Sequence, residues 1–185
     1  SKKHILKQAE NSLRFLETDY LDLLLVHRPD YLMDPHEIAQ AFTQLKEQGK
    51  VKHFGVSNFT PIQFETLNSL FSLETNQVEI SITRLDAFED GTLLLCQKNK
   101  IAPTSWSPLG GGKVFEKTED EKILRIQKVG NELAEKYNVG LDQILLAWLI
   151  KHPSGIIPVI GTSKIERVKS ALDACKIELT RQEWY

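Results

Sequence analysis

Two segments of the sequence carry residues that could bind an anion. The segment 161–164, GTSK, places a glycine, two hydroxyls and a lysine at the start of a predicted helix, where free backbone N–H groups and the helix dipole favour negative charge. Arg167 lies three residues after Lys164 on the same face of that first turn, and its guanidinium could bind a phosphate in bidentate fashion. The second segment, SPLGGG at 107–112, lets the backbone approach a ligand closely and follows Trp106, whose indole could stack on a flat ring.

Other polar residues also end short apolar runs. His27 ends the run LDLLLV, Ser57 and Asn58 close HFGVSN, and Gln77 and Glu79 lie in NQVEI. Taken singly, each residue also fits a structural role, as a turn residue or as a polar group paired within the core. Together they favour a functional site, because the catalytic and binding residues of a parallel α/β sheet or barrel lie at the carboxyl ends of its strands.

Apolar periodicity predicts strands that alternate with helices. Strands are predicted at 21–26, 53–57, 76–80, 102–106 and 156–160. Helices are predicted at 5–16, 35–48, 61–70, 92–98, 119–137 and 141–151, with two more after Ser163 and Thr180. Capping boxes are predicted for the pairs Asp34 and Glu37, Thr60 and Gln63, Ser163 and Glu166, and Thr180 and Glu183.

The alternation of strands and helices indicates right-handed βαβ units and a parallel sheet. A doubly wound sheet and part of an eight-stranded barrel both fit this pattern. No G-x-G-x-x-G turn follows any of the predicted strands, which weakens the doubly wound alternative that binds dinucleotides.

Composition excludes several classes of protein. The 185 residues are 41% hydrophobic and 26% charged, which fits one domain with its own core. A net charge of -2 argues against a nucleic-acid or anionic-membrane surface, and no apolar run is long enough to span a membrane. The N-terminus lacks the apolar stretch of a secretory signal. Cys96 and Cys175 fit reduced thiols, and the five histidines show no metal-ligand spacing, so we expect a cytoplasmic, metal-free domain.

The sequence resembles the aldo-keto reductase family. The matching segments are LDLLLVHRPD, GKVKHFGVSNF, NQVEIS, SWSPLGGG and IPVIGTSKIERV, in the order and at the spacing of the family. They extend from about residue 21 to residue 172 and are most similar to those of bacterial oxidoreductases with HRPD and a tryptophan before SPLGGG. The resemblance implies a (β/α)8 TIM barrel, of which residues 1–185 would form a single domain with about five βα units, strands 4–8.

The resemblance also implies NADP(H) as the cofactor, extended across the carboxyl-terminal face of the barrel. Ser57, Asn58 and Gln77 match the positions that bind the nicotinamide carboxamide, and Trp106 matches the aromatic residue beneath the nicotinamide ring. Two further groups of residues match positions that bind phosphates in the family. The pyrophosphate loop is matched by Ser107, Leu109, Gly110, Gly111 and Gly112. The segment at the 2′-phosphate is matched by Gly161, Thr162, Ser163, Lys164 and Arg167. The family often has Glu-Asn for the adenine where this sequence has Ser170 and Ala171, so the resemblance does not extend to adenine contacts.

His27 matches the active-site histidine of the family, which orients the substrate carbonyl for hydride attack. Arg28 follows it where many relatives have tryptophan; it could attract carboxylate or hydroxyl-bearing substrates, or pair with Asp30 or Glu79. The other catalytic residues of the family, an Asp, a Lys and the Tyr that acts as general acid, precede the matching region, so we expect them upstream of Ser1 in a longer polypeptide. The implied function is NADPH-dependent reduction of a small aldehyde or ketone to an alcohol.

Two alternative functions stay open. A non-catalytic nicotinamide-binding subunit of the same fold, with a regulatory or interaction role, would present an exposed apolar patch to its partner. A different barrel enzyme could use the segment 161–167 for a phosphorylated metabolite, although Trp106 and the GVSN motif argue against it. We expect neither a nucleic acid nor a membrane as partner, and the sequence does not predict the oligomeric state or the physiological substrate.

Overall fold

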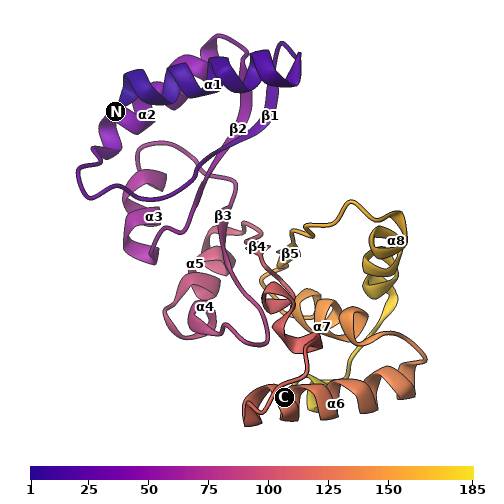
Figure 1. Ribbon diagram of the computed structural model, residues 1–185. Coiled ribbons are helices and arrows are strands. Elements are labelled where there is room, and N and C mark those ends of the chain that lie inside the picture. The colour runs from indigo at the N-terminus through magenta and orange to yellow at the C-terminus, as the bar shows by residue number, and fades with distance from the viewer. The chain divides into compact units, whose positions relative to one another are not determined.

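The computed structural model describes residues 1–185 and divides into two compact units, Ser1–Gln77 and Val78–Tyr185, which we call the first and second units. Strands alternate with helices along the chain (Figure 1). β1 pairs with β2, β2 with β3 and β4 with β5, each in parallel, and the strands follow one another in the order β1-β2-β3-β4-β5. This order lacks the reversal that marks a doubly wound sheet, so the structure supports the barrel-type alternative. The prediction of a single domain over residues 1–185 stays a prediction.

The first unit pairs two complete strands and covers them with helices. Its elements are α1 (Lys2–Leu16), β1 (Leu21–Val26), α2 (Pro35–Glu47), β2 (Val51–Ser57), α3 (Pro61–Asn68) and the start of β3 (Asn76–Glu79). The core contains Phe42 and Phe54, both fully buried, with ring centroids 4.4 Å apart, and Phe71 meets both rings edge-on. This aromatic cluster packs α2 against β2.

Capping side chains fix where the helices of this unit begin. Thr60 and Gln63 form the predicted capping box at the start of α3, with both reciprocal bonds present. At the start of α2, Asp34 accepts from the backbone N–H of His36 at 2.8 Å, but Glu37 does not complete the predicted box. The difference follows from the geometry of the cap, because Asp34 bonds to the second helical residue rather than to the third.

The second unit contains more helix than strand. Its elements after β3 are α4 (Asp86–Glu89), α5 (Thr92–Asn99), β4 (Thr104–Trp106), the 3₁₀ helix η1 (Gly110–Phe115), α6 (Glu121–Tyr137), α7 (Leu141–Ile150), β5 (Ile157–Pro158), α8 (Ile165–Asp173), η2 (Ala174–Lys176) and α9 (Arg181–Trp184). The strand β5 is shorter than the predicted strand 156–160. The helix α4 was not predicted, because four residues are too few to show a helical period.

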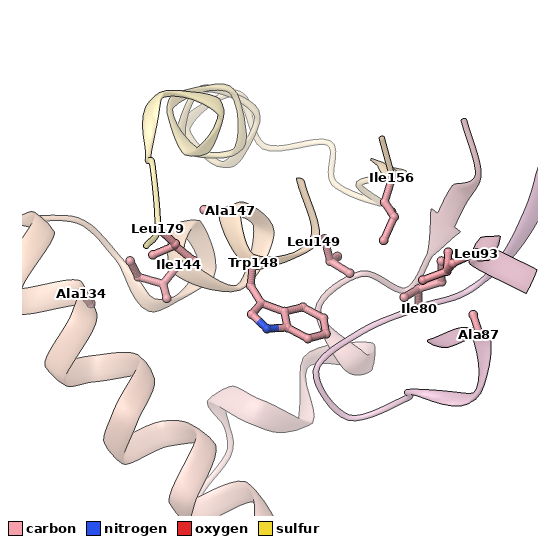
Figure 2. Packing of buried hydrophobic residues seen from close by; sticks show 10 residues of the cluster. All are labelled: Ile80, Ala87, Leu93, Ala134, Ile144, Ala147, Trp148, Leu149, Ile156 and Leu179. Atoms are coloured by element: carbon pink, nitrogen blue, oxygen red, sulfur yellow. The ribbon is translucent and has the colours of Figure 1, made fainter. Parts of the chain in front are cut away.

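Helix α7 forms the core of the second unit. Its residues from Ile144 to Leu149 are all buried. Figure 2 shows Ile144 beside Leu179 on one side of Trp148, while Leu149 lies toward Ile80 on the other. An element buried on so many sides is a rigid support for the segments that pack against it.

The C-terminal segment is attached to α7 through two tryptophans. The indoles of Trp148 and Trp184 are stacked, with centroids 5.1 Å apart and planes 9° apart. Each indole N–H donates to the backbone oxygen of the other residue at 2.9 Å. The two residues therefore satisfy each other's buried polar groups while they bury apolar area.

Glu183 makes a second attachment of the C-terminal segment, to α6. It completes the predicted capping box with Thr180, and its carboxylate also accepts from Lys136 Nζ at 2.5 Å and from the hydroxyl of Tyr137 at 2.8 Å. The ammonium of Lys136, followed by the Thr180 groups and the Tyr137 hydroxyl, lowers the pKa of Glu183 to about 2.

Both cysteines are free, and their surroundings differ. Cys96 is buried in α5, and burial raises the pKa of its thiol to about 11. Cys175 is exposed in η2. The structure contains no group of three or more His, Cys, Asp or Glu side chains arranged to hold a metal ion. None of the helices combines the length and the apolar character needed to cross a membrane.

Candidate cofactor-binding and active site

Hydrogen bonds within the first unit join the carboxyl ends of β1 and β2 to each other and to Gln77, the second residue of β3. The hydroxyl of Ser57 donates to the backbone oxygen of Gln77 at 2.7 Å, and the backbone N–H of Asn58 donates to the same oxygen at 2.9 Å. The side-chain amide of Asn58 donates to Ser57 Oγ at 3.0 Å and to the backbone oxygen of His27 at 3.2 Å. Four residues that the sequence singled out are therefore joined in one network.

Asn58 adopts a backbone conformation that is uncommon for residues other than glycine. Its φ is 60°, in the left-handed region that asparagine tolerates better than most side chains. The turn aims its amide back across the strand ends, so that it reaches both Ser57 and His27. The side-chain amide of Gln77 is half-buried and has no hydrogen-bond partner, which leaves it available to a ligand at this edge.

A cavity of about 430 Å³ opens beside His27. Its lining includes Arg28, Asp30 and Glu37, together with apolar residues of β1. Arg28 is exposed and forms no ion pair with Asp30, whose Oδ1 instead accepts from the backbone N–H of Leu32 at 2.9 Å. Glu79, the other predicted partner of Arg28, lies 3.9 Å from Nε of Arg84 in the second unit.

In the second unit, the strand β4 leads into the glycine-rich loop. The hydroxyl of Ser105 donates to the backbone oxygen of Ile80 at 2.6 Å and fixes β4 just before the half-buried Trp106. Ser107 has a φ of 48° and its carbonyl accepts from the N–H of Gly110 at 2.9 Å, which closes a tight turn. Leu109, between them, packs on Val114 and its neighbours. The loop is therefore fixed at its base.

Gly110 is held against a turn that the sequence did not indicate. Ser81 and Arg84 exchange two backbone hydrogen bonds, so that Thr83 lies at the tip of a tight turn. A Cβ on Gly110 would come within 2.5 Å of Thr83 Oγ1, and the φ of Gly110 is 60°, so only glycine fits here. Gly111 and Gly112 also have positive φ, but nothing lies near them. No motif in the sequence pointed to Thr83.

The segment 161–164 precedes α8 as an open stretch of backbone. None of the hydrogen bonds in the structure uses the backbone N–H groups of Gly161, Thr162 or Ser163. Ser163 was predicted to cap the helix with Glu166, and this prediction is wrong: Lys164 is the N-cap residue, without a side-chain cap. Thr162 Oγ1 accepts from the N–H of Lys164 at 3.2 Å, a local turn that precedes the helix, and α8 begins at Ile165, one residue later than the cap at Ser163 requires.

Two cations stand at this open stretch. Lys164 and Arg167 are both exposed, and neither forms an ion pair. Unpaired N–H groups, hydroxyls and two free cations at a helix start are the groups that bind a phosphate. Within the second unit, the residues that the sequence predicted for a phosphate therefore lie together at the start of α8, and their role in binding stays a prediction.

None of the four tyrosines is arranged as a proton donor within these two groups of residues. Tyr137 is bound to Glu183, and Tyr20 lies beneath Nζ of Lys52, 3.7 Å from the ring centroid. Tyr31 and Tyr185 are exposed. Hydrogen bonding to Glu183 raises the pKa of Tyr137, which disfavours its ionised form.

Comparison with known proteins identifies the chain at the level of its family. The sequence profile of the Aldo/keto reductase family matches residues 1–185. The chain belongs to this family. It is 46% identical over 190 residues to the uncharacterized oxidoreductase YcsN of Bacillus subtilis and 48% identical over 185 residues to the oxidoreductase YdhF of Escherichia coli. It is 42% identical over 184 residues to a 6-dehydroglucose reductase of Agrobacterium fabrum.

The matches cover nearly the whole chain but only part of these family members. They include 100%, 98% and 98% of this chain and 62%, 61% and 61% of the three relatives, in the order given above. The chain thus spans about three fifths of the length of the aldo/keto reductases that it matches.

Solved aldo-keto reductase structures have the same fold over this region. The thermostable aldo-keto reductase Tm1743, in complex with the inhibitor epalrestat, matches with a TM-score of 0.90 and 29% identity over 100% of this chain and 65% of its own. An aldo/keto reductase of Klebsiella pneumoniae, in complex with NADP and acetate, matches with a TM-score of 0.82 and 29% identity over 95% of this chain and 60% of its own. These matches confirm the predicted aldo-keto reductase type of barrel, represented here by five parallel strands.

Proposed function

We propose that the protein is an NADPH-dependent oxidoreductase that reduces an aldehyde or a ketone to an alcohol. The observation that carries the proposal is the hydrogen-bonded network that joins His27, Ser57, Asn58 and Gln77 in a chain of this family. NADPH, when bound, supplies the hydride, which adds to the carbonyl carbon while a proton adds to the oxygen. We assign that proton to none of the four tyrosines of this chain.

The residues of each unit fit one part of the cofactor. In the first unit, the Gln77 amide and Ser57 Oγ, which Asn58 holds in place, offer donors and acceptors to a carboxamide. In the second unit, Lys164 and Arg167 with the open N–H groups before α8 fit a phosphate, and Gly110 to Gly112 leave backbone accessible to a pyrophosphate. These two unpaired cations favour NADPH over NADH, because only NADPH carries a 2′-phosphate that they could bind.

His27 is proposed to orient the substrate. Its imidazole would donate a hydrogen bond to the carbonyl oxygen, and the bond from Asn58 to its backbone oxygen holds the end of β1 at a fixed place. A group that binds the oxygen where negative charge develops lowers the activation free energy of the reduction more than it strengthens substrate binding.

Arg28 is proposed to select hydroxylated substrates. Its guanidinium shares the cavity beside His27 with three carboxylates, those of Asp30, Asp34 and Glu37. An anionic substrate would meet more negative than positive charge there, whereas the hydroxyls of a sugar can both donate to carboxylates and accept from a guanidinium. The similarity to a 6-dehydroglucose reductase is in keeping with a carbonyl compound derived from a sugar.

The test uses the full-length protein and follows NADPH consumption with simple aldehydes, ketones and oxidised sugars. We expect His27→Ala to lower kcat/KM by about 100-fold, the typical effect of losing one group that binds the oxygen in the transition state. The matched control is His53→Ala, because His53 is exposed and paired only with Glu74. Absence of NADPH oxidation with every carbonyl compound, or equal effects of the two variants, would contradict the proposal.

A further inference from the structure

Polar contacts at one residue join α8 to α7. No residue of α8 is buried, and Ser170 and Ala171 are the only two that are not exposed. Burial of apolar side chains therefore contributes little to fixing the turn that carries Arg167. The hydrogen bonds at Ser170 are the specific contacts that define how this helix is oriented.

Ser170 bonds to two side chains of α7. Its hydroxyl donates to Asp142 Oδ2 at 2.9 Å, and its carbonyl oxygen accepts from Gln143 Nε2 at 3.1 Å. The amide of Gln143 is itself fixed, because its Oε1 accepts from the backbone N–H of Gly140 at 2.9 Å. Both partners of Ser170 thus belong to one hydrogen-bonded helix start.

The first turn of α7 is a firm support for these bonds. It leads directly into the buried residues from Ile144 onward. The carboxylate of Asp142 lies over Gly140, since a Cβ at that glycine would come within 2.4 Å of Asp142 Oδ1. Gly140 therefore leaves the space in which the carboxylate can reach Ser170.

Ser170 follows Arg167 by three residues, so the two are neighbours on the surface of the helix. Because Arg167 and Lys164 form no ion pairs, their own side chains do not orient α8. We propose that Ser170 is a positioning residue, whose bond to Asp142 orients α8 so that Lys164 and Arg167 meet a phosphate monoester. This inference rests on the proposed function and concerns the 2′-phosphate of the cofactor.

Calorimetric titration of the full-length protein with NADPH, NADH and adenosine 2′-phosphate tests the proposal. We expect Ser170→Ala to raise the Kd of NADPH and of adenosine 2′-phosphate by about tenfold, the equivalent of one hydrogen bond, and that of NADH by less than about twofold. Ser170→Thr keeps the hydroxyl and should restore the affinity. Ser12→Ala is the matched control, because Ser12 is a serine of α1 that bonds only to the carbonyl of Gln8.

A second variant breaks the same bond without removing either partner. Gly140→Ala has an ordinary φ and needs only the displacement of the Asp142 carboxylate, so it should repeat the selective loss seen with Ser170→Ala. In the background of Arg167→Ala, the effect of Ser170→Ala on NADPH should largely disappear, because a positioning residue acts through the residue that it positions.

Several outcomes would overturn the inference. Equal losses for NADPH and NADH would show a general structural role of Ser170, and full additivity with Arg167→Ala would show that it does not act through that residue. If the unchanged protein prefers NADPH and Ser170→Ala retains this preference, only the positioning role fails. If the unchanged protein binds neither nucleotide, the proposed function fails as well.

Discussion

The strand ends of the first unit and the phosphate-binding candidates of the second unit are built in different ways. Ser57 and Asn58 are paired with each other and with the backbone of neighbouring strands, whereas Lys164 and Arg167 are exposed and make no ion pair. Pairing among polar groups fixes their geometry, which suits recognition of a neutral planar group such as a carboxamide. Free cations next to open backbone supply charge, which is what binding a phosphate requires most.

The largest effect that tests this difference is expected at Gly55, within β2. A Cβ there would come within 2.7 Å of both Leu25 Cδ2 and the carbonyl oxygen of Thr75. We expect Gly55→Ala to lower the free energy of unfolding by about 3 kcal/mol, because a backbone oxygen cannot move aside as a flexible side chain can. Equilibrium unfolding in urea measures this change in the free energy of unfolding. The control is Gly161→Ala in the second unit, where nothing lies within 4 Å; a similar loss there would contradict the comparison.

A smaller effect is expected at Asn58. Asn58→Ala removes the bonds to Ser57 and His27 and leaves an alanine in the left-handed region, so unfolding should become easier by about 2 kcal/mol. Asn58→Gly removes the same side chain without the backbone strain and should lose about 1 kcal/mol. If the two variants were equally stable, the left-handed backbone at this position would carry no strain.

The second unit also contains a charged group that hydrogen bonds hold in place, Glu183, and its contribution to stability should respond to pH. The pKa of Glu183 is about 2, below its ordinary value of 4.5, so its contribution to stability is fully present above pH 4.5 and is lost as the pH falls toward 2. We expect a modest loss, because Lys136 is exposed and solvent screens the pair. Thermal unfolding between pH 5 and about 2 measures it. Glu183→Gln should show a flatter dependence, and an unchanged slope would contradict the assignment.

The smallest effect on stability is expected at Arg167. Arg167→Ala should change the free energy of unfolding by no more than about 0.5 kcal/mol, because the side chain is exposed and unpaired. The affinity for NADPH should fall nonetheless, which calorimetry measures in the same sample. A clear loss of stability would mean that Arg167 has a structural partner and that the two regions differ less than described.

Much of the fold could be predicted because its signals are local. The apolar run at β1, the Thr60 and Gln63 box and the Thr180 and Glu183 box each lie within a few residues of sequence, and the structure contains all of them. The cap at Ser163 was mispredicted because the helix begins one residue later, with Lys164 as its N-cap residue and Thr162 Oγ1 accepting from the N–H of Lys164. Local patterns do not decide between two capping residues that are adjacent in sequence.

The contacts that the sequence did not reveal join distant segments. Trp148 and Trp184 are 36 residues apart, and Ser170 is 28 residues from Asp142. The apolar periodicity of α7, α8 and α9 does not indicate these partners, because each side chain alone also fits a surface or a core position. The candidate site residues were found only where they lie at strand ends, and the residues that support them, such as Thr83, were not.

The two cysteines differ so much in exposure that a thiol reagent should distinguish them. At neutral pH the thiol of Cys96 is protonated and covered, so alkylating reagents should leave it unmodified. Cys175 is exposed two residues after the end of α8. Within residues 1–185, a fluorescent maleimide should therefore label Cys175 and leave Cys96 unmodified, and the label should follow the environment of α8 during a nucleotide titration.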